Sequence, residues 1–429
     1  MKKLTTTIVT LLTAGAVIGI LSACTTNGSV QDATTADMMQ VSRLETPRGE
    51  DLYTLYTELP KRHKDFFHAG DMEEFHDEYE KALIDIDSLT DIDFYFTLRR
   101  LAAYSKDSHT SVGFTQELAT QLHGIPAQVQ YLDGAWRLSV VEADRRELLG
   151  AEVLAINGNP IEEVIAAATP LFSHDNETWL LRAIGQQLNL TELYVYLGLS
   201  ETSTDPVVLT LAVPGNTMET TITLEPVTVG AFREMELATI YDKLPPTGMS
   251  NQPYRFMELD GGQTVFVQYN VCADYEAYPL KTFIGEVLGT IDERDPEHII
   301  IDLRYNGGGN SSLFEPMVDA LSTRQKAKGF QLDVLIGEGT FSSALMNAMH
   351  FKQRTDARLV GSPSGGSVNH YGEIKSFTLP NSGIPVTYST KFFTMYAAHA
   401  GGSLQPDLFV QPEVADMLAG IDTTVEAIL

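Results

Sequence analysis

The sequence predicts an α/β protein in which a helical region and a β-rich region precede a layered α/β region. Between residues 51 and 104, apolar residues recur at helical spacing. From about 115 to 225, short runs alternate apolar and polar residues and are broken by Gly, Pro and Asn, which is typical of strands. From about 254 to 429, strand-type and helix-type runs alternate, which indicates helices packed on a sheet.

The helical region is expected to form a three-helix unit that begins after Pro47 and ends near Ser105. Asp71 and Thr90 precede its second and third helices and are suitable N-caps, because their side-chain oxygens accept from free backbone N–H groups. Its apolar positions at helical spacing are Leu52, Leu55, Tyr56, Leu59, Phe75, Tyr79, Leu83, Ile86, Phe94, Leu98 and Leu101.

In the β-rich region, Asn157-Gly158 follows an apolar strand and predicts a tight turn, because both residue types tolerate positive φ. A helix is expected directly after this turn, over 161–168. The predicted strands of this region are 127–132, 136–141 and 207–213.

In the α/β region, the predicted strands are short runs of β-branched or aliphatic residues, as in buried strands. They are 264–269, 299–303 and 333–336, and the predicted helices are 278–292, 312–321 and 343–352.

The N-terminus has Lys2 and Lys3 before an apolar run, which predicts a secretory signal peptide over 1–23. A Leu-Ser-Ala tripeptide directly before Cys24 resembles the lipobox of bacterial lipoproteins. That resemblance implies lipid attachment at Cys24, a flexible tether over 24–45 and a place on the extracytoplasmic face of a membrane. An uncleaved anchor or a soluble secreted protein is the alternative.

The composition limits the partners of this protein. The chain has 57 acidic and 29 basic residues in 429, which gives a net charge of −28 and disfavours binding to nucleic acid. Cationic or unfolded polypeptides would not be repelled. If Cys24 is lipidated, only Cys272 remains, so no intramolecular disulfide is expected.

The strand at 299–303 leads into a run of glycines that ends at Gly309. Successive glycines expose backbone N–H groups, which suits an oxyanion or a phosphate. The run lacks the Lys-Ser/Thr of a phosphate-binding loop, which argues against nucleotide binding. The alternative is a tight turn with a structural ion pair between Asp302 and Arg304.

Two serines, Ser342 and Ser343, lie where the strand at 333–336 leads into the next helix. A serine at such a junction has an exposed hydroxyl, and the helix N-terminus beside it favours developing negative charge. The alternative is an ordinary N-cap serine.

Four stretches together resemble the C-terminal-processing, or tail-specific, serine peptidases in order and spacing. They are 302–309 (DLRYNGGG), 340–344 (TFSSA), 360–366 (VGSPSGG) and 406–407 (PD). The resemblance implies a crotonase-like (ClpP/crotonase) peptidase core over 226–429. A PDZ-like domain over 115–225 is indicated by similarity at residues 148–160, after a helical N-terminal domain over 46–114. The alternative is that the region over 115–225 only separates the two other domains.

The family pattern, aligned without gaps, makes Ser342 the nucleophile, with Ser343 as second choice. It implies an oxyanion hole formed by the Ser343 amide and the amides of Gly307 and Gly308.

The general base departs from the usual family pattern, because the position of the common lysine is occupied by Ser367. Some branches, similar to the tricorn core and to nisin-degrading peptidases, use a histidine from the N-terminal region instead. Here residues 106–112 (KDSHTSV) offer His109, whose imidazole suits proton removal at neutral pH. His370, oriented by Glu373, is the competing choice. Lys352 and Lys391 are the remaining cationic candidates.

The predicted function is therefore hydrolysis of peptide bonds in peptides or protein tails by a membrane-anchored serine peptidase without a cofactor. The alternative is a catalytically inactive surface protein that binds peptides on the same scaffold. A thioester-handling relative of the crotonase type has no recognisable coenzyme A site to support it. Other histidines, such as His63, His68 and His76, are placed on charged helical faces and have no zinc-site spacing.

Overall fold

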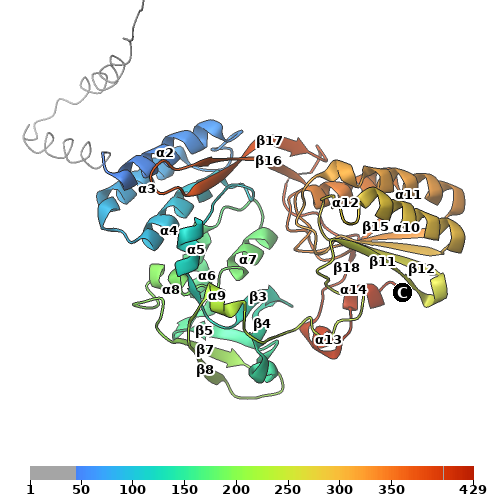
Figure 1. Ribbon diagram of the computed structural model, residues 1–429, viewed down its shortest axis with the longest axis horizontal. Coiled ribbons are helices and arrows are strands. Elements are labelled where there is room, and N and C mark those ends of the chain that lie inside the picture. The colour runs from blue at the N-terminus through green and yellow to red at the C-terminus, as the bar shows by residue number, and fades with distance from the viewer. Residues whose placement is uncertain (1–44, 400) are drawn as a thin grey trace, which may run out of the picture.

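The computed structural model describes residues 45–399 and 401–429, so the predicted signal peptide and Cys24 lie outside the described residues. Helical, β-rich and α/β regions follow one another along the chain (Figure 1). In the described part, no helix is long and apolar enough to cross a bilayer.

The helical region confirms the predicted three helices and both predicted caps. Asp71 accepts from the amides of Glu73 and Glu74, and Thr90 forms a capping box with Asp93. Its elements are α2 (Pro47–Arg62), α3 (Met72–Ile84), α4 (Asp91–Ala102) and the short strand β1 (Ser111–Val112).

The β-rich region forms a seven-stranded sheet in the order β10-β4-β5-β7-β8, with β3 on β4 and β6 on β5. The predicted turn is confirmed, because Asn157 and Gly158 have φ of 49° and 78° and join β5 to β6 as a tight hairpin. The strands of this region are β2 (His123–Gly124), β3 (Gln128–Leu132), β4 (Ala135–Glu142), β5 (Glu152–Ile156), β6 (Asn159–Pro160), β7 (Val207–Ala212), β8 (Thr220–Leu224), β9 (Val227–Thr228) and β10 (Leu237–Thr239). The helices are α5 (Gln116–Gln121), α6 (Ile161–Ala168), α7 (Glu177–Gly185), α8 (Thr191–Tyr196) and α9 (Val229–Phe232).

The α/β region contains a six-stranded sheet in the order β11-β12-β13-β14-β15-β18, in which only β11 is antiparallel to its neighbour. The strands are β11 (Tyr254–Leu259), β12 (Thr264–Tyr269), β13 (His298–Asp302), β14 (Gln331–Ile336), β15 (Arg358–Gly361), β16 (Asn369–Thr378), β17 (Pro385–Thr394) and β18 (Leu408–Phe409). The helices are α10 (Leu280–Arg294), α11 (Glu315–Lys328), α12 (Ser343–Arg354), α13 (Val414–Ala419) and α14 (Thr423–Glu426).

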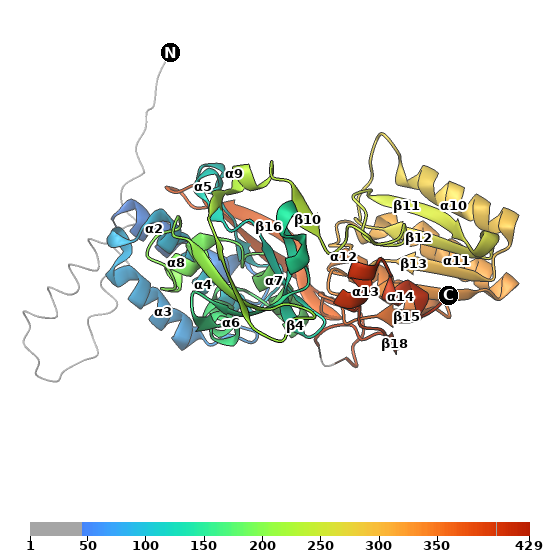
Figure 2. The same ribbon diagram turned by 90° about the horizontal axis from the view of Figure 1, so that it is seen from below.

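Both faces of this sheet are covered, which explains why its strands read as continuous apolar runs. On one face, alternate residues such as Val265, Val267 and Ile299 share a core with α10, α11 and α12. On the other face, Phe266 and Ile300 pack against the C-terminal segment around α14 (Figure 2). Parallel strands end at the same edge of a sheet, so the loops after β13 and β14 meet there.

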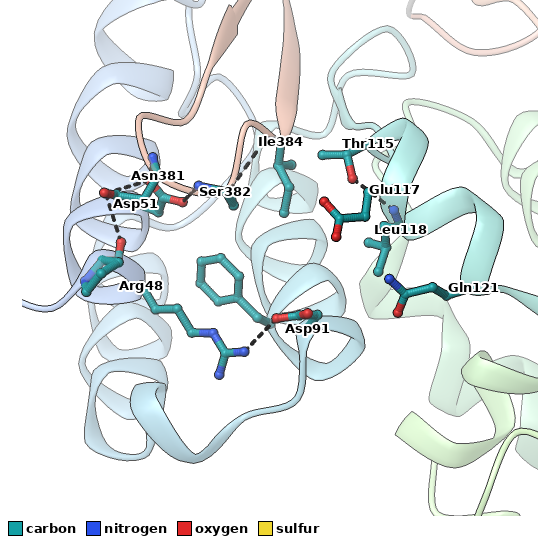
Figure 3. A pocket seen from close by; sticks show the side chains of 12 residues that line it. Arg48, Asp51, Asp91, Thr115, Glu117, Leu118, Gln121, Asn381, Ser382 and Ile384 are labelled. Carbon is teal, nitrogen blue, oxygen red and sulfur yellow. Dashed lines mark hydrogen bonds and ion pairs between the residues drawn. The ribbon is translucent and has the colours of Figure 1, made fainter.

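The hairpin of β16 and β17 leaves the α/β region and joins the helical region in a sheet ordered β1-β17-β16. Asp51 of α2 holds its tip by accepting from the amides of Asn381 and Ser382, at 2.8 and 2.7 Å. These residues line the pocket of about 310 Å³ in Figure 3, which contains none of the predicted site residues. The hairpin therefore brings the last third of the chain against the loop that carries His109.

Two strand pairings cross the predicted domain limits at residues 114/115 and 225/226. The division into three domains stays a prediction. β10 pairs with β4 although it lies beyond residue 225, and β17 pairs with β1 across the whole chain.

Candidate active site

Ser342 lies at the N-cap of α12 in a strained backbone conformation, with φ 53° and ψ −122°. Positive φ is unfavourable for a residue with a Cβ, and such strain at a strand-to-helix turn projects the side chain outward. The Ser342 side chain makes no capping hydrogen bond, which argues against the alternative of an ordinary N-cap serine. It is half-buried, so its hydroxyl remains available for chemistry.

Ser343 has a structural contact instead. Its side chain is buried, and its Oγ donates to the carbonyl of Gly309 at 2.7 Å. This bond holds the glycine loop against α12. The Ser343 amide, in contrast, lies in the first turn of the helix, where backbone N–H groups have no helical partner.

Gly308 approaches the serine turn at residues 341–343 too closely for any side chain. A Cβ on Gly308 would lie 2.7 Å from the Ser342 Cβ and 3.1 Å from the Ser343 amide, and its φ is 106°. The predicted role of Gly308 as a donor needs correction, because its amide already donates to the Asn306 side chain at 2.9 Å.

Gly309 offers a better-directed donor. In its bridge with Cys272, the hydrogen bonds come from the neighbouring residues, so the amide and carbonyl of Gly309 point to the opposite side. On that side its carbonyl meets Ser343. Within the described residues, the amides of Gly307 and Gly309 donate to no partner.

Gly308→Ala is expected to lower turnover by on the order of 10²-fold, because the new methyl group displaces Ser342 and the donors around it. Positive φ adds a stability cost of about 1 kcal/mol or more. Steady-state kinetics and thermal unfolding measure the two effects. Gly329→Ala is the matched control, since Gly329 also has positive φ (74°) but its Cβ would meet no atom within 4 Å. Equal turnover in both variants would contradict the close approach.

The predicted ion pair between Asp302 and Arg304 is present. It stabilises the stretch before the glycine loop, and within the described residues the loop still leaves backbone amides free. Arg304 donates from Nε and Nη2 to the two oxygens of Asp302, and from Nη1 and Nη2 to Asp422. Burial opposes ionisation of Asp422, but the attraction of Arg304 outweighs it and lowers the pKa of that carboxyl. The cluster fixes the end of β13 to the C-terminal segment.

His109 lies against the serine turn at residues 341–343. Its ring stacks on Phe341, the residue before Ser342, with centroids 4.5 Å apart, and Phe341 also stacks on Trp179 at 4.0 Å. The imidazole is buried, and neither ring nitrogen makes a hydrogen bond within the part of the chain that the structure describes. The fold thus brings the imidazole beside the serine turn, without a bond to the Ser342 hydroxyl in this state.

Asp107 is the carboxylate beside His109. The closest approach of this carboxylate to the His109 ring, from Asp107 Oδ1 to His109 Nδ1, is 3.6 Å, which is too long for a hydrogen bond but short enough for strong attraction. Asp107 is fully buried and accepts from the His109 amide, the Thr110 and Ser389 hydroxyls and the His63 ring. Burial opposes its ionisation, but these hydrogen bonds and the nearby histidines outweigh that cost and lower its pKa far below the usual range.

His63 also belongs to this site. The prediction that it lies on a charged helical face is wrong. It is buried, and its Nε2 lies 3.1 Å from Asp107 while its Nδ1 accepts from the Asp65 amide. Because Nδ1 accepts, the proton is assigned to Nε2, which donates to Asp107. A signal was present, since His63 continues the apolar stripe of Leu55 and Leu59 at a spacing of four residues.

His370 is the second ring that stacks on His109. Its ring centroid is 5.7 Å from that of His109, which itself contacts Phe341. Burial and the neighbouring His109 lower the pKa of His370 to about 4, and its Nδ1 lies 2.9 Å from the Ser367 carbonyl. A neutral, weakly basic imidazole held in this way is the poorer candidate base.

The pKa of His370 predicts a specific loss of stability in acid. Between pH 6.5 and about 4, His370 binds a proton in the unfolded chain but not in the folded chain. The free energy of unfolding therefore falls as the pH is lowered. The full effect is about 3 kcal/mol. His370→Gln is expected to reduce this fall, as measured by urea unfolding at pH 7 and pH 4.5. An equal fall in both proteins would contradict the prediction.

Glu373 does not orient a histidine in this structure, which corrects its predicted role. Its carboxylate is exposed and pairs with Lys391 at 2.5 Å. Lys352 pairs with Asp407 at 2.5 Å, so both candidate lysines are used at the surface. Among residues 45–399 and 401–429, no group of three His, Cys, Asp or Glu side chains could hold a metal ion.

No protein-family model matches the sequence, and no curated protein matches it. Among solved structures, a CPAF mutant has a TM-score of 0.62 and 15% identity, over 89% of this chain and 95% of that one. Mature CPAF complexed with lactacystin has a TM-score of 0.60 and 14% identity, over 89% and 96%. The chain has the fold of CPAF.

A looser similarity, with a TM-score of 0.44 and 14% identity, covers 88% of this chain and 98% of the photosystem II D1 C-terminal processing protease. These structural neighbours belong to the C-terminal-processing peptidase family, in agreement with the resemblance of the sequence motifs. The CPAF likeness spans the helical, β-rich and α/β regions together, because it covers 89% of this chain.

Proposed function

We propose that this protein is a serine peptidase that hydrolyses peptides or protein tails through Ser342. One observation carries the proposal: a strained, half-buried serine begins a helix while the buried imidazole of His109 stacks on the residue before it. A shared fold with CPAF adds support, although a fold alone never determines an activity.

In the proposed reaction, the Ser342 Oγ attacks the carbonyl carbon of the scissile peptide bond and His109 accepts the hydroxyl proton. The carbonyl oxygen becomes an anion, which the Ser343 amide and the Gly309 amide stabilise, with Gly307 as a further donor. Each donor is worth on the order of 3 kcal/mol of the barrier. His109 then returns the proton to the leaving amine, and water releases the acyl group by the same steps in reverse.

In the proposed catalytic triad with Ser342 and His109, Asp107 takes the place that was predicted for Glu373. Its position beside Nδ1 favours the tautomer with the proton on that nitrogen, which leaves Nε2 free to accept from Ser342. His109 makes no hydrogen bond to Ser342 in this structure, so the proposed mechanism requires the two side chains to come together on substrate binding, as catalytic groups of unliganded sites often do.

The setting of the enzyme is also a proposal. Lipidation at Cys24 would hold the protein on the extracytoplasmic face of a membrane, and the net charge of −28 favours cationic or unfolded peptide substrates. Within this scheme the β-rich region is a PDZ-like domain and the α/β region a crotonase-like core.

The second candidate function is an inactive peptide-binding protein. It is favoured by the unbonded His109 and by Ser367 at the position of the usual lysine. A fluorophosphonate probe separates the two functions, because an activated serine reacts and a relic does not. We expect labelling of the wild type and of Ser343→Ala, and none of Ser342→Ala. An unlabelled wild type would leave only the binding function.

A further inference from the structure

A cavity of about 190 Å³ lies between α4, α7 and the loop that carries His109. Its wall includes Ser108 and Thr110, on either side of His109, and Trp179, which stacks on Phe341. The cavity therefore lies beside the loop that carries His109, and Trp179 connects its wall with the residue before Ser342. At about 30 Å³ per water molecule it has room for a carboxylate and a short side chain.

Arg99 of α4 lines this cavity and is 92% buried, since only 8% of its surface is exposed. Its Nη1 bonds to the Gln187 side chain and lies 3.4 Å from the Tyr95 hydroxyl. Its guanidinium also lies over the Phe172 ring, 4.5 Å from the centroid. Within the described residues, Arg99 forms no ion pair with an Asp or Glu side chain.

The other buried arginine of the described chain shows what is missing. Arg304 uses Nε and Nη2 together to bind both oxygens of Asp302. In Arg99, Nε and Nη2 donate to no described residue. Neither nitrogen is completely enclosed by protein atoms, so both remain accessible. A buried cation without an anion is costly, so an unpaired fork at a cavity wall indicates a site for an incoming anion.

We propose that Arg99 binds a carboxylate of the peptide substrate, in a subsite beside His109. This inference rests on the proposed peptidase function and names a feature of its substrates. The planar fork of a guanidinium matches a carboxylate with two parallel hydrogen bonds. The carboxylate is the C-terminal group of the peptide or the side chain of an Asp or Glu near the scissile bond.

The test uses binding of three pools of N-acetylated random hexapeptides to a Ser342→Ala, Trp136→Phe protein. The first pool has a free C-terminal carboxylate and no Asp or Glu. The second is its amide, and the third is an amidated pool that contains Asp and Glu. Trp179 is then the only tryptophan and lines the cavity, so its fluorescence reports occupancy.

We expect the first or the third pool to bind at least about tenfold more tightly than the second, which identifies the source of the carboxylate. Arg99→Gln should reduce that pool to the affinity of the second, and Arg99→Lys should restore part of the difference. Arg100→Gln is the matched control, because this neighbour on α4 pairs with Glu78 at the surface and should leave the preference unchanged.

If the three pools bind equally to the Ser342→Ala, Trp136→Phe protein, which keeps Arg99, the inference is overturned. This outcome can be measured even if Arg99→Gln fails to fold. A preference that survives Arg99→Gln overturns it too, as does inorganic phosphate that binds while no peptide pool does. The proposed function fails separately: if the wild type cleaves no peptide but binds carboxylate pools through Arg99, only the peptidase is lost. Cleavage through Ser342 without a carboxylate preference removes only the subsite.

Discussion

Ser342→Ala is expected to lower the rate of peptide hydrolysis by on the order of 10⁴- to 10⁶-fold, because the variant cannot form the acyl-enzyme. Alanine keeps the Cβ and the same backbone strain, so the thermal unfolding midpoint should shift little. Steady-state hydrolysis of an unstructured fluorogenic peptide, together with calorimetry, measures both quantities.

The matched control for this prediction is Ser343→Ala. Its hydroxyl positions the Gly309 carbonyl but does not react, so the variant should lose far less activity than Ser342→Ala, together with about 1 kcal/mol of stability from the broken hydrogen bond. The assignment of the nucleophile would be wrong if Ser343→Ala abolished turnover and Ser342→Ala did not. Unchanged turnover in both variants would remove the peptidase mechanism.

Asp107→Asn is expected to reduce turnover by on the order of 10²- to 10⁴-fold, because Asn cannot hold His109 in the tautomer that leaves Nε2 free. The variant should also lose about 2–4 kcal/mol of stability at pH 7, since the buried carboxylate accepts from donors that an amide nitrogen would oppose. Kinetics and urea unfolding measure these effects.

The pH dependence tests the electrostatic part of this prediction. Because the folded pKa of Asp107 lies far below its unfolded value of about 3.9, its stabilisation is complete above about pH 4 and is lost as the pH falls further. The difference in stability between wild type and variant should therefore narrow in acid. Glu373→Gln, at an exposed ion pair, is the control. If Glu373→Gln slowed turnover while Asp107→Asn did not, the assignment of Asp107 as the carboxylate of the triad would be wrong.

Much of the fold could be predicted from local patterns, because those patterns have physical causes that act over a few residues. The strand 264–269 and the helix 161–168 were predicted with the bounds of β12 and α6. The caps at Asp71 and Thr90 were predictable for the same reason, since a capping side chain bonds to amides two or three residues away.

The serine turn was also visible in the sequence, as serines between a buried strand and a helix. Which serine points outward was not, because the choice depends on a positive φ at Ser342 and on the bond from Ser343 to Gly309. The family spacing selected Ser342, and the backbone geometry gives an independent physical reason for the same choice.

The surroundings of His109 show where local patterns stop. Asp107 lies two residues before it, yet its role depends on Ser389 and His63, from opposite ends of the described chain. The β16–β17 hairpin, which was not predicted, brings Ser389 there. Glu373 was chosen because it lies near His370 in sequence, but its backbone has a positive φ of 56° and its exposed side chain pairs with Lys391 of β17.

By itself, the sequence determined the order of helices and strands, the glycine-rich loop, the serine turn and the strongly acidic charge, because each depends on residues close together in the chain. Only the tertiary structure decided which histidine meets the serine turn, which carboxylate stands beside it and which buried arginine of the described chain is left without a counter-ion. Those outcomes depend on burial and on contacts across up to 282 residues, as between Ser389 and Asp107. Packing creates them and no local pattern encodes them.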